Sequence, residues 1–194
     1  MKKRIVLASA SPRRRQLLAQ VGIPHEVIVS NANEDVTGTP PEQVMEVALR
    51  KAFAVQAMLE VDDAIIIAAD TLVSIDGEVL GKPADSTEAF AMLKKLQGAT
   101  HVVLTGVVIV ANGERNVMVD AAEVTFRKLT DEDINAYIAT GEPFDKAGAY
   151  GIQEVGSVLV ERIHGDFYTV MGLPIAKVCA ALVSMGYDFW GNRL

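Results

Sequence analysis

The sequence has 194 residues, of which 50% are hydrophobic and only 6% aromatic, so aliphatic side chains must fill most of any core. The formal net charge is −7. Because nucleic-acid-binding proteins usually carry a basic surface, this charge argues against both non-specific and sequence-specific nucleic-acid binding. Any phosphate site must therefore be a local concentration of Lys and Arg on an acidic protein.

The single cysteine, Cys179, makes an intrachain disulfide impossible, and its apolar surroundings favour a small core residue. No stretch reaches the roughly 18 consecutive apolar residues of a membrane span. The basic N-terminus is followed by an apolar run that Ser9, Ser11 and Pro12 interrupt too early for a signal sequence. We therefore expect a cytoplasmic protein that does not act at a membrane.

The first half of the chain alternates strand and helix patterns. Strands are expected at residues 5–9, 25–29 and 64–69, with helices at residues 12–21, 42–59 and 85–97. Ser11 followed by Pro12 is typical of a helix start, and Asp85 with Glu88 resembles a capping box. Residues 31–41 are polar and rich in turn formers, which indicates a loop.

Hairpin patterns dominate the second half. Asn112-Gly113 is a strong turn signal, which predicts a hairpin of strands at 101–111 and 115–126. Further strands are expected at 157–163 and 167–171 as a second hairpin, with helices at 130–141 and from Gly172 to about Gly186. The whole pattern predicts an α/β fold with a mixed twisted sheet. We expect a single domain over residues 1–194, with two lobes around a deep cleft.

The apolar run 64–69 ends at Asp70, a carboxylate that follows a strand expected to be buried on both faces. An ionised Asp in such a place needs an Arg, a Lys or a metal ion as its partner. Because sites are common where strands of α/β sheets end, Asp70 could bind Mg²⁺ or take a proton from a water nucleophile. The alternative is a strand-end cap that bonds to nearby backbone N–H groups.

The segment from Ser9 to Arg14 joins the first strand to the start of a helix. Free backbone N–H groups and the helix dipole attract phosphate at such a place. Ser9 and Ser11 add hydroxyl donors, and Arg13 or Arg14 can bind a phosphate through two nitrogens. The alternative is an ordinary capped helix with a solvated basic first turn.

Three further charged residues could complete a phosphate site. Lys82, held in a Gly-Lys-Pro turn, could offset the charge that develops on a pyrophosphate leaving group. Glu34 lies in the polar loop and matters only if the fold brings it beside Asp70. Lys51 lies in the middle of a helix, where a lysine ordinarily lies along the surface with its ammonium group in water.

The glycine-rich segment 145–153 permits close approach of a ligand to the backbone. Gln153 at its end offers an amide donor and an acceptor together, and this pair matches the N3–H and O4 of uracil or thymine. A glycine-rich loop without a ligand is the alternative. The sequence shows no convincing Cys/His metal cluster, Walker-type loop, dinucleotide-binding motif or Ser-His-Asp order.

Taken together and in order, these segments resemble the Maf family of nucleoside triphosphate pyrophosphatases. The pieces that carry the resemblance are Ala8 to Arg14, Glu34, Lys51, Ala69-Asp70-Thr71, Gly81-Lys82-Pro83, His101 with Thr105-Gly106, residues 124–127, residues 145–153 and Gly172-Leu173-Pro174. They span nearly the whole chain. No single piece is specific, but the ordered set is.

The resemblance implies a mixed-sheet fold similar to that of the inosine triphosphate pyrophosphatases. It also implies cleavage between the α- and β-phosphates, which gives a nucleoside monophosphate and pyrophosphate. Asp70 matches the family's general base, with Glu34, Lys51 and Lys82 beside it. The combination at the family's specificity positions resembles the dTTP/UTP branch, and these positions are Arg13, Thr71 and Gln153. A homodimer is expected from the resemblance alone.

We therefore expect a nucleotide diphosphatase that acts on dTTP, UTP and modified uridine triphosphates with Mg²⁺ or Mn²⁺, in a house-cleaning or cell-division role. Asp70 and Glu34 would hold the metal, and Lys51 and Lys82 would offset charge. The expected substrate-binding residues are Ser9, Ser11, Arg13, Arg14, Thr71 and Gln153. Two alternatives stay open: a pyrophosphatase for 7-methyl-GTP or another modified nucleotide, and a non-catalytic inhibitor of septum formation that acts through a protein partner.

Overall fold

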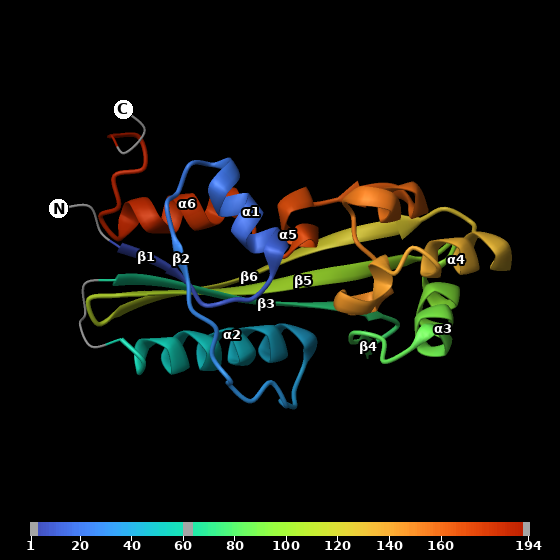
Figure 1. Ribbon diagram of the computed structural model, residues 1–194, viewed down its shortest axis with the longest axis horizontal. Helices are drawn as coiled ribbons and strands as arrows, with labels where there is room; N and C mark the ends of the chain where they lie inside the picture. Colours follow the sequence, from blue (N-terminus) through green and yellow to red (C-terminus); the bar gives the residue numbers. More distant parts are fainter. Residues whose placement is uncertain (1–3, 60–63, 192–194) are drawn as a thin grey trace. The chain divides into compact units, whose positions relative to one another are not determined.

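The computed structural model describes residues 4–59 and 64–191 (Figure 1). The basic N-terminus, residues 1–4, therefore lies largely outside the described residues. The elements, in chain order, are β1 (Arg4–Leu7), α1 (Pro12–Gln20), β2 (Glu26–Val27), α2 (Pro40–Gln56), β3 (Ala64–Ile75), β4 (Glu78–Leu80), α3 (Ser86–Leu96), β5 (Thr100–Ala111), β6 (Glu114–Phe126), α4 (Asp131–Ile138), the 3₁₀ helices Glu142–Asp145, Ala147–Ala149 and Glu154–Leu159, β7 (Val160–His164), α5 (Phe167–Met171) and α6 (Ile175–Ser184). Within the described ranges, no helix combines the length and apolar character needed to cross a bilayer.

The strands form a seven-stranded sheet in the order β2-β1-β3-β5-β6-β7, with β4 paired to β3 beside this path. β1 is parallel to β2 and β3, whereas β4 is antiparallel to β3 and β7 is antiparallel to β6. The hairpin at Asn112-Gly113 is confirmed, and both residues have the positive φ that a two-residue type I′ turn requires. The predicted mixed α/β fold is likewise confirmed.

The chain divides into two compact units, and neither is a continuous segment. The first unit comprises residues 1–70, 105–120 and 172–194, and the second comprises residues 71–104 and 121–171. β3, β5 and β6 contribute residues to both units. The single domain over residues 1–194 and the cleft between two lobes stay predictions.

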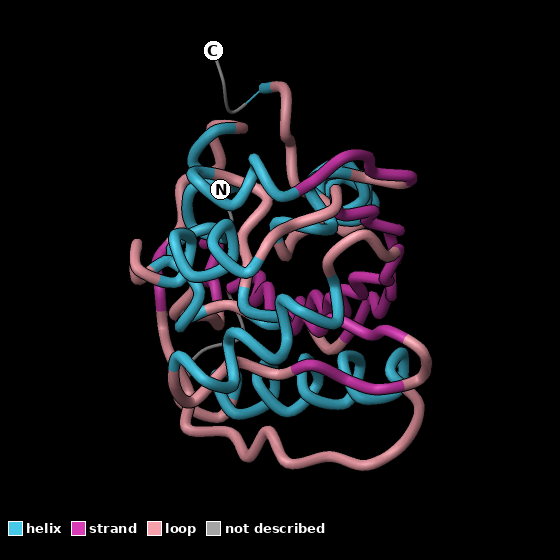
Figure 2. Tube along the Cα trace, turned by 90° about the vertical axis from the view of Figure 1, so that its right-hand side faces the viewer, coloured by secondary structure: helices cyan, strands magenta, loops and turns pink. Residues whose placement is uncertain are grey.

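In the first unit, α2 lies on one side of the strands, and α1 and α6 lie on the other (Figure 1). Figure 2 shows the helices and strands from a second direction. Alternate residues of the central strands pack against α2, and the shared cluster includes Val6, Ala8, Ile66, Ala68, Ala48 and Ala52. The intervening strand residues are equally buried on the opposite face, which explains the continuous apolar run 64–69.

Close approach of α2 to β5 depends on Gly106. A Cβ atom built on Gly106 would lie 2.5 Å from the carbonyl oxygen of Val44, so any side chain there would push the helix away from the sheet. Lys51 lies two turns further along α2. The Gly106 contact therefore sets the distance of Lys51 from the sheet.

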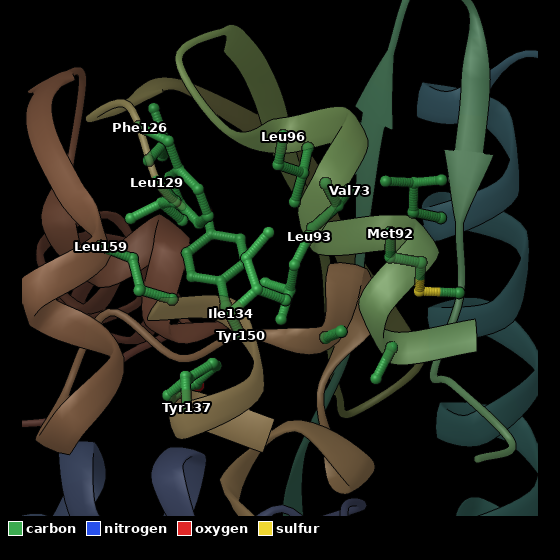
Figure 3. Packing of buried hydrophobic residues seen from close by; sticks show 14 of the residues in the cluster. Val73, Met92, Leu93, Leu96, Phe126, Leu129, Ile134, Tyr137, Tyr150 and Leu159 are labelled. Carbon is green, nitrogen blue, oxygen red and sulfur yellow. The ribbon is translucent and has the colours of Figure 1, made fainter. Parts of the chain in front are cut away.

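The core of the second unit packs α3 and α4 around buried aromatic and aliphatic side chains (Figure 3). His101, Phe126 and Tyr150 contact one another edge to face, with ring centroids 4.7 to 5.3 Å apart. His101 is only 1% exposed, and its Nε2 lies 2.7 Å from the Tyr150 hydroxyl. Its Nδ1 has no hydrogen-bond partner among the described residues.

Three local predictions were wrong. Residues 167–171 form the short helix α5 rather than a strand, because the Asp166 carboxylate accepts the N–H of Tyr168 and starts a helical turn. β3 does not end at Asp70 but continues to Ile75, because β4 pairs with its last residues. β2 is limited to two residues.

Burial of His101 should make stability depend on pH. Burial lowers the pKa of His101 from 6.5 to about 4, so the unfolded chain binds the proton first as the pH falls. Stability should therefore be lost between about pH 6.5 and pH 4, by about 2 to 3 kcal/mol at pH 4.5. Urea unfolding at pH 7 and pH 4.5 measures this loss. Because glutamine does not titrate, the free energy of unfolding of His101→Gln should fall by about 2 to 3 kcal/mol less than that of wild type between pH 7 and pH 4.5. An equal fall in both proteins would show that His101 is not the group responsible.

Candidate active site

A buried arginine joins three segments of the first unit. Arg14, in the first turn of α1, is 8% exposed. Its Nε donates to the carbonyl oxygen of Gly172 at 2.8 Å. Its Nη1 donates to Ser9 Oγ at 2.9 Å and to the carbonyl oxygen of Ala69 at 2.8 Å. One side chain therefore connects the end of β1, the middle of β3 and the turn before α6.

The charge of Arg14 is maintained by nearby carboxylates. Burial lowers its pKa to about 10, whereas the negative charges of Asp70 and Glu34 act in the opposite direction. Arg13 in the same turn lowers the pKa further through repulsion. The side chain is still a cation at neutral pH, so the start of α1 carries a fixed positive charge that adds to the helix dipole.

Lys51 connects two predicted catalytic carboxylates. Its Nζ lies 2.9 Å from Asp70 Oδ1 and 3.1 Å from Glu34 Oε1. The Lys51 side chain is 13% exposed and that of Asp70 is 20% exposed. Lys51 is therefore not the solvated surface lysine that its helical position alone would favour. The loop residue Glu34 does lie beside Asp70, which was the condition for its relevance.

Arg50 holds the loop that carries Glu34, and the sequence reasoning missed it. Its Nη1 donates to the carbonyl oxygens of Asn33 and Asp35, at 3.3 and 3.1 Å. The Asn33 side chain also accepts the N–H of Asp35 at 2.7 Å. These bonds fix the backbone on both sides of Glu34. No pattern in the sequence marks Arg50, since its partners are main-chain groups some 15 residues away.

The donor atoms of this site suit a hard divalent cation. Asp70 and Glu34 bring carboxylate oxygens to one ammonium group, so their oxygens lie close together. Mg²⁺ is usually bound by one or two carboxylates together with substrate phosphates and water. Among residues 4–59 and 64–191, no three His, Cys, Asp or Glu side chains gather into a metal-binding group. Asp70 and Glu34 could hold a metal whose other coordination positions are filled by substrate phosphates and water.

The remaining predicted residues, Thr71, Lys82 and Gln153, belong to the second unit. Gly148 donates its N–H to the carbonyl oxygen of Gly81 at 2.9 Å, which ties the segment 145–153 to the turn that carries Lys82. The side chain of Val73, two residues after Thr71 on β3, lies directly against Gly148. The three segments that carry these residues are thus in mutual contact.

Gln153 is half-buried, and its side-chain amide makes no hydrogen bond to any residue that the structure describes. Lys82 is exposed in the turn between β4 and α3. Both side chains are accessible to a ligand.

At the start of α1, the predicted groups are arranged around Ser9. Ser11 is the N-cap, and its N–H donates to Ser9 Oγ at 3.2 Å. Arg13 lies half-exposed in the first turn. The Nε and Nη1 groups of Arg14 donate to protein oxygens, and binding of a phosphate by Arg14 stays a prediction.

The family model described as Maf-like protein matches residues 4–185. The chain belongs to the Maf family. A Maf relative named dTTP/UTP pyrophosphatase, from Bacillus velezensis, is 50% identical over 184 residues, which cover 94% of this chain and 96% of the relative. Another of that name, from Caldicellulosiruptor saccharolyticus, is 46% identical over 198 residues, covering 99% and 100%.

Among solved structures, a HAM1 protein from Coxiella burnetii is similar to this Maf chain with a TM-score of 0.54. The match covers 95% of this chain and all of the other, at 15% identity. At that identity the similarity shows a shared fold.

Removal of the Arg14 guanidinium should destabilise the protein. Arg14→Met would leave the Gly172 and Ala69 carbonyl oxygens and Ser9 Oγ without this donor in a buried place. We expect the free energy of unfolding, measured with urea at pH 7, to fall by about 3 kcal/mol. Arg15→Gln, an exposed position on the same helix, should change it by less than about 0.5 kcal/mol. Equal stability of the two variants would show that Arg14 does not hold these segments.

Proposed function

We propose that this Maf-family protein is a nucleoside triphosphate pyrophosphatase that hydrolyses dTTP and UTP to the nucleoside monophosphate and pyrophosphate. The observation that carries the proposal is the convergence of Asp70 and Glu34 on Lys51, beside the positively charged start of α1. The choice of nucleotide is supported by the names of relatives that are 46 to 50% identical over nearly the whole chain.

The start of α1 would bind the triphosphate. Its first backbone N–H groups, the Ser9 and Ser11 hydroxyls and Arg13 are all donors suited to phosphate oxygens. Arg14 would act mainly by holding this turn against β3, given its bonds to protein oxygens. Lys82 would offset the charge that develops on the departing pyrophosphate.

Asp70 would accept a proton from the water that attacks the α-phosphorus. A new P–O bond then forms on the α-phosphorus, and the bond to the oxygen between the α- and β-phosphates breaks. The pyrophosphate leaves with that electron pair, and the monophosphate keeps the new oxygen. Lys51 orients the Asp70 carboxylate through the 2.9 Å contact, and it offsets negative charge during the attack.

We propose Mg²⁺ or Mn²⁺ as the cofactor, held by Asp70 and Glu34. The support is the pair of hard oxygen donors that meet at one point. When bound, the metal would neutralise phosphate charge. Gln153 and Thr71 would select the base. The homodimer and the cytoplasmic location stay predictions from the sequence.

The proposal is tested by release of pyrophosphate from dTTP, UTP, CTP, GTP, ITP and 7-methyl-GTP with Mg²⁺ or Mn²⁺. We expect release from dTTP and UTP above the others. Release from 7-methyl-GTP instead would keep the reaction but overturn the choice of nucleotide. Absence of release from every nucleotide would contradict the enzymatic proposal and favour action through a protein partner.

Replacement of Asp70 by Asn should abolish most turnover, because an amide cannot accept the proton. We expect kcat to fall by about 10² to 10⁴-fold, with the far-ultraviolet circular dichroism spectrum unchanged. Asp131→Asn is a matched control, since Asp131 also pairs with a lysine, Lys94, but at the start of α4. Its kcat should stay close to wild type. Near-normal turnover of the Asp70 variant would exclude Asp70 as the general base.

A further inference from the structure

The segment around Gln153 has an unusual backbone. Ala149 and Glu154, on either side of residues 150–153, have φ values of 60° and 56°, a conformation that residues with a Cβ atom rarely adopt. Residues in such conformations are retained only where surrounding contacts hold them, and they gather at functional sites. The contacts that hold this segment therefore determine where the Gln153 side chain can reach.

The main contact is made by the carboxylate of Glu142. Its Oε2 accepts the N–H of Val155 at 3.1 Å, and its Oε1 accepts the N–H of Gly156 at 3.2 Å. These two N–H groups follow Gln153 by two and three residues. Hydrogen bonds to a carboxylate are stronger than those to a neutral oxygen, so Glu142 fixes the backbone immediately after Gln153.

Tyr137 extends this contact to the residues before Gln153. Its hydroxyl donates to Glu142 Oε1 at 3.1 Å and accepts the N–H of Gly151 at 3.2 Å. Burial raises the pKa of Tyr137, so the hydroxyl keeps the proton that it donates. We call Glu142, Tyr137 and the three N–H groups of Gly151, Val155 and Gly156 the Glu142 clamp.

The two ends of the clamped segment meet directly. A Cβ atom built on Gly156 would lie 2.2 Å from the carbonyl oxygen of Gly151, so only glycine allows the segment to close. On the N-terminal side, the Tyr150 ring is buried against His101 and Phe126. The backbone of Gln153 is thus fixed from both directions, while its amide has no partner among the described residues.

We propose that Glu142 is a positioning residue for base selection, which acts by fixing the place from which the Gln153 amide meets the base. This inference rests on the proposed function, in which Gln153 reads uracil or thymine. Uracil presents an acceptor at O4 and a donor at N3, whereas cytosine presents a donor at N4 and an acceptor at N3. A fixed backbone limits the side-chain rotamers with which the Gln153 amide can reach the base. A mobile backbone adds further rotamers, and with them the opposite orientation of the amide, which suits cytosine.

The test compares kcat and KM for UTP and CTP in the wild-type protein, Glu142→Gln, Gln153→Ala and the double variant. CTP is measured as a competitive inhibitor where its turnover is undetectable. Gln at 142 keeps one acceptor oxygen but places an NH₂ group where the clamp needs an acceptor. We expect the UTP-to-CTP ratio of kcat/KM to fall about tenfold in Glu142→Gln, mainly through KM for UTP. The double variant should resemble Gln153→Ala, because both changes act through one side chain.

Asp133→Asn is the matched control. The Asp133 carboxylate also accepts a backbone N–H, that of Thr130 at 3.0 Å, but at the start of α4. Its UTP-to-CTP ratio should equal that of wild type. If Glu142→Gln does not fold, Tyr137→Phe replaces it, since this change removes the hydroxyl from the clamp and keeps the buried ring.

Each outcome separates the clamp from the proposed function. If Gln153→Ala leaves the ratio unchanged, base reading by Gln153 fails and the inference falls with it. If Gln153→Ala lowers the ratio and neither clamp variant does, only the inference is overturned. Equal losses for UTP and CTP in Glu142→Gln, or a loss that adds fully to that of Gln153→Ala, would assign Glu142 to stability alone.

Discussion

The first unit depends on one permanent positive charge that lies almost entirely buried. A buried guanidinium is tolerated only if protein oxygens replace its hydration, and Arg14 obtains them from Ser9 Oγ and the carbonyl oxygens of Ala69 and Gly172. This requirement brings together segments that are 55 and 158 residues away from Arg14 in sequence. The negative charges of Asp70 and Glu34 in turn act on Arg14, where they oppose the lowering of its pKa by burial.

α2 supplies the two cations that hold the Glu34 loop. Arg50 and Lys51 are adjacent in sequence, but they act on different parts of the Glu34 loop. Arg50 binds main-chain oxygens on either side of Glu34, and Lys51 binds its carboxylate together with that of Asp70. These contacts hold the Glu34 backbone and its carboxylate in one arrangement in the absence of substrate.

Structural features that depend on residues close together in the sequence could be predicted. The type I′ hairpin, the capped helices and the doubly buried strand follow from local turn chemistry and periodicity, and Asp70 was recognised because a carboxylate is out of place after such a strand. The continuation of β3 past Asp70 was not predictable, because it depends on pairing with β4. Nor was α5, whose residues have strand-like composition but follow the cap of Asp166.

The groups that hold the candidate site were the least visible in the sequence. Arg50, Glu142 and Tyr137 bind backbone atoms of distant loops, and a main-chain partner leaves no trace in residue type. Lys51 was favoured as a solvated side chain because helical spacing cannot show what lies opposite a residue. Candidate site residues could therefore be predicted from unusual residue types, whereas the contacts that orient them could be identified only from the three-dimensional structure.

Because Gly106 contacts Val44, a substitution at position 106 would move residues elsewhere on α2. A Cβ atom at 106 would meet the backbone of Val44 and Met45, so α2 would have to move away from β5, and Arg50 and Lys51 on the same helix would move with it. The Glu34 loop, bonded to both, would follow the helix, but Asp70 on β3 would stay with the sheet. A substitution at an uncharged glycine would therefore separate the two carboxylates from each other without replacing any of the ionic residues.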